Sequence, residues 1–345
     1  MKRTLSIILA LAMLLCLCAC GSEGDTSNTT ESTPTTTTPV KQVNPFTGKD
    51  DMGEQSTRPV AIMVTNEPGI IGKQYGIDKA DFYMETEAEG SVPRIMAVFA
   101  SADRIPDKLG PIRSARTPFI ATANAFGCVY VYSGATTYVT NILKSMQNFD
   151  RITNTDSTTL WRDDYLSNNA NVSWNNLITG SKQIAAKMEK SGMSATAVKA
   201  LPFTFGEKSG TITANTVQMK TTASTNVTFI YDAATGLYGK NRGTAESCKP
   251  HKSLEGNQIQ VSNVLVLHAE KYVEFKNAKY TWYNFRTGEG TGYLISNGTA
   301  RQIKFNRTEN SLSFTEMDGS PAVFAEGKTY MCLTDKNLAG DLSFS

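Results

Sequence analysis

The chain has 345 residues, of which 34 are Lys or Arg and 32 are Asp or Glu, giving a formal net charge of +2. Nucleic-acid-binding proteins usually carry a strongly basic surface, so this near balance argues against nucleic acid as a partner. The 6 cysteines have no spacing typical of a zinc site, so we expect neither a metal nor a cofactor. Cys128 and Cys332 lie in apolar strand patterns and are expected to be buried free thiols, whereas a disulfide of Cys248 stays open.

The first 20 residues are typical of a secretory signal, because basic residues precede an apolar run over residues 5–15. This run is too short for a comfortable membrane span, which needs ~20 residues. Ala19 directly before Cys20, with Leu17 three positions before the cysteine, resembles a bacterial lipobox. That resemblance implies that Cys20 becomes the mature N-terminus and carries lipid such as palmitate. The protein would then be anchored on the extracytoplasmic face of the cell membrane; a plain signal peptide or a membrane anchor is the alternative.

Residues 21–57 are rich in Thr, Ser, Asn and Pro and contain almost no apolar residue. Such a segment cannot bury enough surface to order itself, so we predict a disordered tether between the membrane and the body. Residues 44–48, with the sequence Asn-Pro-Phe-Thr-Gly, are a candidate docking segment where this tether meets the body.

From residue 58 onward, predicted strands alternate with predicted helices. Apolar or β-branched runs predict strands at 59–66, 82–84, 95–100 and 129–132, and capping and apolar patterns predict helices near 117–126, 137–146 and 181–190. After Pro202 the pattern changes to recurrent short strands with Gly-containing turns such as Asn297-Gly298. We therefore predict an α/β or α+β domain over residues 58–205, followed by a mostly-β domain over residues 206–345.

Charged residues concentrate in and after two neighbouring strands of the first predicted domain. They are Glu85, Glu87, Glu89, Arg94, Arg113 and Arg116. The three glutamates alternate along the chain, so a continuing strand would place their carboxylates on one face. Arginine forks suit carboxylate or phosphate, so three arginines beside free N–H groups of a helix would form an anion clamp.

The candidate ligand-binding site has further members elsewhere in the first domain. Asn66 ends the first strand, and Arg162 and Asp163 belong to a later Trp-Arg-Asp segment. In the leading hypothesis, the arginines hold anionic oxygens, and Glu85 and Glu87 orient the arginines or accept ligand hydroxyl hydrogens.

Two other interpretations of the charged cluster stay open. The arginines can pair with the acidic residues inside the domain and organise the fold without binding anything. Alternatively, a glutamate acts as a base and the arginines stabilise developing negative charge, as in a cell-wall hydrolase or transferase. Ser114 lacks a G-x-S-x-G context and a recognisable base, so a capping role is expected for it and no catalytic residue is assigned.

Several motifs, in this order, resemble the YerB-like lipoproteins, a two-domain bacterial family of unknown function. The most specific is Gly-Pro-Ile-Arg-Ser-Ala-Arg at residues 110–116. The others lie at residues 58–61, 80–81, 85–90, 94, 161–163, 231–238, 262–264 and 327–329. The resemblance covers most of the mature chain and implies a two-domain fold and an envelope location, but no reaction. The resulting hypothesis is a lipid-anchored binding or accessory factor for an anionic or glycan-containing envelope component or a partner protein.

Overall fold

The computed structural model describes residues 42–52, 56–155, 157–169, 175–244, 247–277 and 281–345. The predicted signal peptide, Cys20 and most of the predicted tether lie outside these ranges. Residues Lys41–Ser345 form one compact unit. Within the described ranges, no helix combines the length and the apolar character that crossing a membrane would require.

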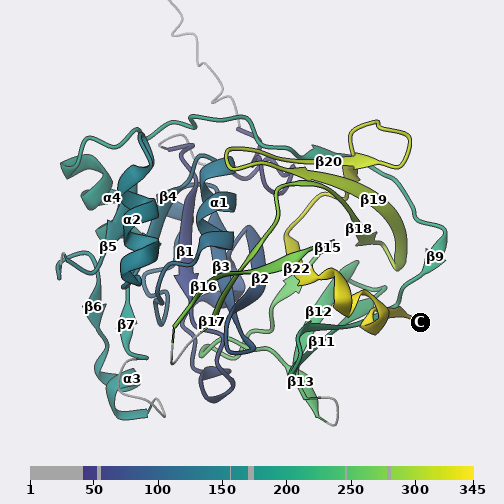
Figure 1. Ribbon diagram of the computed structural model, residues 1–345, viewed down its shortest axis with the longest axis horizontal. Coiled ribbons are helices and arrows are strands. Elements are labelled where there is room, and N and C mark those ends of the chain that lie inside the picture. The colour runs from purple at the N-terminus through teal and green to yellow at the C-terminus, as the bar shows by residue number, and fades with distance from the viewer. Residues whose placement is uncertain (1–41, 53–55, 156, 170–174, 245–246, 278–280) are drawn as a thin grey trace, which may run out of the picture. The chain divides into compact units, whose positions relative to one another are not determined.

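A 13-stranded sheet runs through the described part of the chain (Figure 1). Its main path follows the order β20-β19-β18-β15-β22-β2-β3-β1-β4-β5. These strands are β20 (Leu312–Glu316), β19 (Thr299–Arg307), β18 (Gly288–Ser296), β15 (Asn263–Ala269), β22 (Thr329–Asp335), β2 (Phe82–Glu89), β3 (Val92–Phe99), β1 (Val60–Val64), β4 (Val129–Tyr132) and β5 (Arg151–Thr153). The parallel pair of β2 and β22, from Phe82 opposite Thr329 to Glu85 opposite Cys332, joins the early and late parts of the chain.

The large sheet is buried on both faces, because alternate residues of its strands enter two different apolar clusters. Phe82 and Met84 of β2 pack in one cluster, whereas Tyr83 between them packs in the other. Central strands such as β1 and β22 are therefore near-continuous apolar runs, which is typical of strands that have no face toward water.

The helices belong to the earlier part of the chain. They are α1 (Thr117–Ala125), α2 (Thr137–Ser145), α3 (Asp164–Asn169) and α4 (Ser181–Lys190), with short 3-10 turns at η1 (Pro68–Ile70), η2 (Ile77–Lys79) and η3 (Ala102–Arg104). Pro118 lies in the first turn of α1, and the hydroxyl of Thr136 accepts a hydrogen bond from the Val139 amide at the start of α2. The predicted mixed α/β character of this region is confirmed.

The later part is nearly all strands, as the turn pattern predicted. A second sheet has the order β13-β12-β11-β10-β23, with β14 beside β12. Its strands are β10 (Thr216–Thr222), β11 (Thr225–Asp232), β12 (Leu237–Gly243), β13 (Cys248–Pro250), β14 (Gln260–Val261) and β23 (Ser343–Phe344). The remaining elements are β6 (Trp161–Arg162), β7 (Leu177–Ile178), β8 (Thr204–Phe205), β9 (Ile212–Thr213), β16 (Lys271–Lys276), β17 (Thr281–Phe285), β21 (Val323–Phe324) and η4 (Lys336–Asp341).

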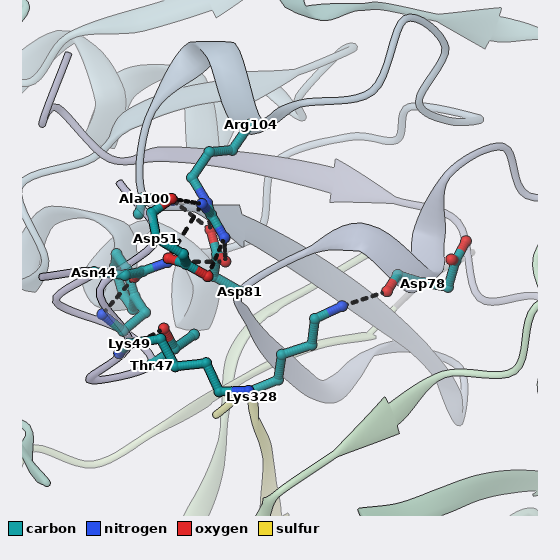
Figure 2. A network of polar contacts seen from close by, with 10 residues as sticks. Asn44, Thr47, Lys49, Asp51, Asp78, Asp81, Ala100, Arg104 and Lys328 are labelled. Atoms are coloured by element: carbon teal, nitrogen blue, oxygen red, sulfur yellow. Dashed lines mark hydrogen bonds and ion pairs between the residues drawn. The ribbon is translucent and has the colours of Figure 1, made fainter. Parts of the chain in front are cut away.

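The candidate docking segment packs into the body. The ring of Phe46 is fully buried, with its centroid 6.0 Å from that of Phe82. Figure 2 shows the polar contacts beside it, in which Asn44 and Arg104 both donate hydrogen bonds to the buried carboxylate of Asp81. The predicted tether over residues 21–57 therefore contains a packed stretch, at the candidate docking segment of residues 44–48.

Candidate functional site

A β-bulge divides the three glutamates that the sequence placed on one face. Glu87 is opposite Pro93 on β3, but Glu89 is opposite Val92, so β2 has one extra residue at Ala88. An extra residue reverses the alternation of side chains beyond it. Glu89 therefore contacts arginines beside α1, while Glu85 contacts the second sheet, and the prediction of a shared face is wrong at Glu89.

Glu89 joins two of the predicted arginines. Its carboxylate accepts hydrogen bonds from Arg94 Nη2 at 2.7 Å, Arg116 Nε at 2.5 Å and Arg116 Nη2 at 2.5 Å. Both guanidinium groups also donate to backbone carbonyl oxygens, Arg94 to Ser114 and Arg116 to Ala115. Burial, with the charge of Arg116, lowers the pKa of Arg94 to about 9, which Glu89 partly opposes. Both guanidinium groups therefore share one carboxylate and complete their contacts with backbone carbonyl oxygens.

Arg113 pairs with a different carboxylate, although its charge still acts on Glu89 and Arg94. It forms an ion pair with Glu67, at 2.5 Å between Arg113 Nη2 and Glu67 Oε1, and Asn175 donates to the other oxygen of Glu67 at 3.3 Å. Asn66 is fully buried, and among the described residues neither atom of its amide group has a hydrogen-bond partner. The structure therefore does not bring the three arginines onto one carboxylate.

Glu85 is fully buried in a polar network between the large sheet and the second sheet. Its carboxylate accepts hydrogen bonds from Thr221 at 3.0 Å and from Tyr330 at 2.5 Å, and Lys240 Nζ lies 3.1 Å away. Burial alone would raise the pKa of Glu85, but the charges of Lys240 and Arg242 outweigh it and the pKa is lowered. A carboxylate sealed in this way cannot meet a ligand from solution.

The network continues from Lys240 into the interior. Lys240, also fully buried, donates to His251 Nδ1 at 2.9 Å, and His251 Nε2 then donates to Gln74 Oε1 at 2.7 Å. Burial, followed by the charges of Lys240 and Arg242, holds the pKa of His251 well below its usual range. The histidine is therefore a neutral structural group that connects β12 and β13 to the earlier part of the chain.

The other predicted site residues make separate local contacts. Glu87 pairs with Lys271 at 2.9 Å. Asp163 pairs with Lys108 at 2.9 Å and accepts from the Leu166 amide in the first turn of α3. Arg162 donates to Asn176 Oδ1 at 2.6 Å. Each side chain has a local partner that organises its loop or strand.

A pocket of about 730 Å³ lies beside α1. Its wall comes from one face of α1, the C-terminal part of α2, the β16–β17 hairpin and the segment from Arg307 to Asn310. This volume is within the ~300–1,000 Å³ of typical ligand pockets. None of the site residues predicted from the sequence lines it, although Thr117 of the pocket directly follows Arg116.

Glu274 and Arg307 are the least exposed of the ionisable side chains that line this pocket, which also include Tyr272, Arg286 and Glu309. Glu274 accepts hydrogen bonds from the Thr117 hydroxyl and from Asn284 Nδ2, and burial raises its pKa. Arg307 is only 4% exposed and donates from Nη2 to the Pro118 carbonyl at 3.0 Å. In the described residues, its Nη1 has no hydrogen-bond partner. Burial lowers the pKa of Arg307 to about 10, so the pocket wall contains a desolvated cation.

Sequence reasoning missed these residues because they lie in ordinary strand patterns. One signal was available in β19, where the buried positions alternate and end with Arg307 after Ile303 and Phe305. An arginine at an inward position of an amphipathic strand requires an acceptor or a ligand.

Neither a cysteine nucleophile nor a metal site is supported by the described residues. Cys128, Cys248 and Cys332 are free thiols, of which Cys128 and Cys332 are buried as predicted. Burial raises the pKa of both buried thiols, which disfavours the thiolate form that a nucleophile needs. No group of three or more His, Cys, Asp or Glu side chains is placed to hold a metal ion within the part of the chain that is described.

The chain belongs to a family of two-domain proteins of unknown function. Residues 46–194 match the N-terminal domain and residues 216–331 match the C-terminal domain of the family described as "Protein of unknown function (DUF3048)". The two matched domains correspond to the mixed and the nearly all-strand parts of the fold, which confirms the expected two-domain character.

The chain is similar to the protein named "Putative lipoprotein YerB" of Bacillus subtilis (strain 168). The two are 23% identical over 296 residues, which cover 83% of this chain and 84% of that protein. A crystal structure of YerB matches with a TM-score of 0.73 and covers 88% of this chain and 100% of the solved chain, at 23% identity. This structural likeness establishes the fold, and the resemblance to YerB-like proteins is confirmed.

Proposed function

We propose that this protein is a lipid-anchored accessory factor of the cell envelope that binds an envelope component in the pocket beside α1. The observation that carries the proposal is the pocket of about 730 Å³ whose wall contains the buried guanidinium of Arg307. A cavity with a few convergent polar groups on an otherwise packed body is the usual form of a small-molecule site.

The predicted Glu/Arg cluster supports this pocket indirectly. Glu89 holds Arg116, the residue that directly precedes α1, and Thr117 then reaches Glu274 in the pocket wall. The internal pairing of these charges favours the interpretation in which they organise the fold. The cluster would therefore position the first turn of α1 and leave ligand contact to the pocket residues.

The location is supported by the leader sequence and by the name of the relative. The lipobox-like Leu-Cys-Ala-Cys at residues 17–20 would make Cys20 the lipid carrier. The similar Bacillus subtilis protein is itself named as a lipoprotein. Each acyl CH₂ contributes about 0.8 kcal/mol to membrane binding, so a multiply acylated Cys20 would hold the body at the extracytoplasmic face.

The test uses the full chain expressed in a Gram-positive host and purified in detergent. Labelled palmitate should be incorporated into the parent protein but not into Cys20→Ala, and the parent should co-sediment with purified cell-wall fractions. Absence of label in the parent would remove the lipid anchor from the proposal. Absence of binding to every envelope fraction would remove the binding role.

A hydrolase or transferase is the second candidate, now at Glu274. Burial raises the pKa of this carboxyl, which is the property that a general acid near neutral pH requires. Incubating cell-wall polymer with the parent and with Glu274→Gln separates the candidates. Turnover that the substitution abolishes supports the enzyme, and binding without turnover in the parent supports the accessory factor.

A further inference from the structure

We propose that the pocket beside α1 takes an acidic saccharide, with the anionic group held at Arg307 and the sugar ring lying against the apolar and amide wall. This inference rests on the proposed function, because it names the ligand class of the same pocket.

Arg307 differs from most of the deeply buried arginines in its lack of a carboxylate partner. A carboxylate oxygen lies within 3.2 Å of four arginines that are 3–7% exposed, namely Arg58, Arg94, Arg116 and Arg301. Arg307, at 4% exposed, and Arg242, at 6% exposed, make no ion pair among the residues that the structure describes, and of the two only Arg307 lines the pocket. A buried charge is costly unless it is paired, so an anion in the pocket would supply the missing partner.

The described residues around Arg307 offer its guanidinium few hydrogen-bond acceptors. Nη2 already donates to the Pro118 carbonyl, and Nη1 has no acceptor among the described residues. Glu274, on the same pocket wall, is held by Thr117 and Asn284. The pocket has a second acidic side chain, the exposed Glu309, and neither it nor Glu274 forms an ion pair with Arg307 in the described part of the chain, although the charge of Glu274 acts on the guanidinium. An anionic ligand would therefore displace no ion-pair partner of Arg307.

The rest of the wall suits a hydroxyl-bearing ring. Tyr272 is 36% exposed and lines the pocket, and the Arg286 guanidinium lies 5.9 Å from its ring centroid. Asn284 and Asn310 add amide groups, while Ile120 and Phe285 add apolar surface. Saccharides combine hydroxyl groups with apolar ring faces, so both kinds of surface find a complement here.

The size and charge of the pocket disfavour simpler ligands. A volume of about 730 Å³ is far larger than a lone phosphate or carboxylate needs. A wholly apolar ligand would leave the Arg307 charge desolvated and unpaired, at a cost that apolar contacts would have to offset.

The experiment titrates the full-length protein in detergent micelles with D-glucuronate and follows binding by calorimetry and by amide chemical shifts. D-glucose provides the ring without the charge, and acetate and inorganic phosphate provide the charge without the ring. We expect saturable binding of glucuronate, with shifts at pocket residues such as Thr117 and Asn284, and much weaker binding of the three comparison probes.

The matched variants are Arg307→Gln and Lys304→Gln, both on β19. A charge-assisted hydrogen bond in a pocket is worth a factor of roughly 10 to 100 in affinity, so Arg307→Gln should raise the Kd for glucuronate by this factor. Lys304 is exposed on the same strand and does not line the pocket, so its substitution should change the Kd by less than about threefold. Arg307→Lys keeps the positive charge but loses the planar guanidinium, so its Kd for glucuronate should lie between those of the parent and Arg307→Gln.

Several results would overturn the proposal. These are equal affinity for glucose, equal affinity for acetate or phosphate, an unchanged Kd in a folded Arg307→Gln protein, and no binding of glucuronate to the parent. If Arg307→Gln does not fold, glucuronate-induced shifts in the parent that avoid the pocket would overturn it equally. If the parent protein binds cell-wall fractions but not glucuronate, only the proposed ligand class is wrong. If it binds neither, the proposed function is wrong as well.

Discussion

Replacing Glu85 by Gln tests whether this carboxylate belongs to the interior or to a ligand site. The substitution keeps the side-chain shape but leaves Lys240, which is fully buried, without its negative partner. Removing one member of a buried ion pair typically costs about 3–5 kcal/mol of folding free energy. We expect the free energy of unfolding of Glu85→Gln to fall by about this amount at pH 7.

The charge state of Lys240 sets an upper bound on that cost. Without Glu85 the lysine can lose its proton, and neutralising a lysine with an ordinary pKa of about 10.4 costs about 4.6 kcal/mol at pH 7. The folded-state pKa of Lys240 is already lowered by burial, which Glu85 opposes, so removing Glu85 lowers it further. A depressed lysine pKa penalises folding below the unfolded-state pKa, so this penalty should shrink by about 1.4 kcal/mol for each unit of rising pH.

The assay is urea unfolding of the parent and the variant at pH 7 and pH 9, followed by tryptophan fluorescence. The matched control is Glu87→Gln on the same strand. Its partner Lys271 is 19% exposed and also lies 3.6 Å from Asp335, so it keeps a negative partner and a smaller loss than that of Glu85→Gln is expected. A Glu85→Gln protein as stable as the parent but unable to bind envelope fractions would refute the reasoning and restore Glu85 as a ligand residue.

Three further substitutions test other parts of the structure. The folded-state pKa of His251 is lowered, so the neutral histidine stabilises the fold above its unfolded-state pKa of about 6.5. The free energy of unfolding should therefore fall by up to about 1.4 kcal/mol for each pH unit below that value. His251→Asn should remove this pH dependence, measured by urea unfolding. Glu89→Gln should lower the free energy of unfolding by about 3 kcal/mol, because two buried guanidinium groups lose their shared carboxylate, and calorimetric unfolding measures the loss. Phe46→Ala should cost about 3–5 kcal/mol and expose residues 42–52 to limited proteolysis, since this ring is fully buried.

The elements that sequence reasoning predicted well are those with a strong local period. The helix at 181–190 and the strands at 59–66 and 129–132 follow from apolar spacing and turn residues, so nearby residues alone determine them. The parallel pairing of β2 with β22 could not be predicted in this way. It depends on which of several apolar strands meet in space, and no local pattern encodes that choice.

The candidate site shows the same division between local and distant information. The sequence identified the charged residues, and the structure places Glu89, Arg94 and Arg116 together. It could not reveal that Glu85 meets Lys240, because the partner lies in a strand of the second sheet. It also could not reveal the bulge at Ala88, since no glycine or proline marks that position.

Both matched domains contribute residues to the pocket wall, and this affects how a ligand would bind there. Thr117 and Pro118, in the first turn of α1, contact Glu274 and Arg307 from the later strands. Because β2 and β22 pair within one continuous sheet, the two parts of the wall are fixed to a common scaffold. A ligand would therefore meet a largely preformed pocket without having to close a hinge, and its affinity would depend on the Arg307 charge rather than on ordering the protein.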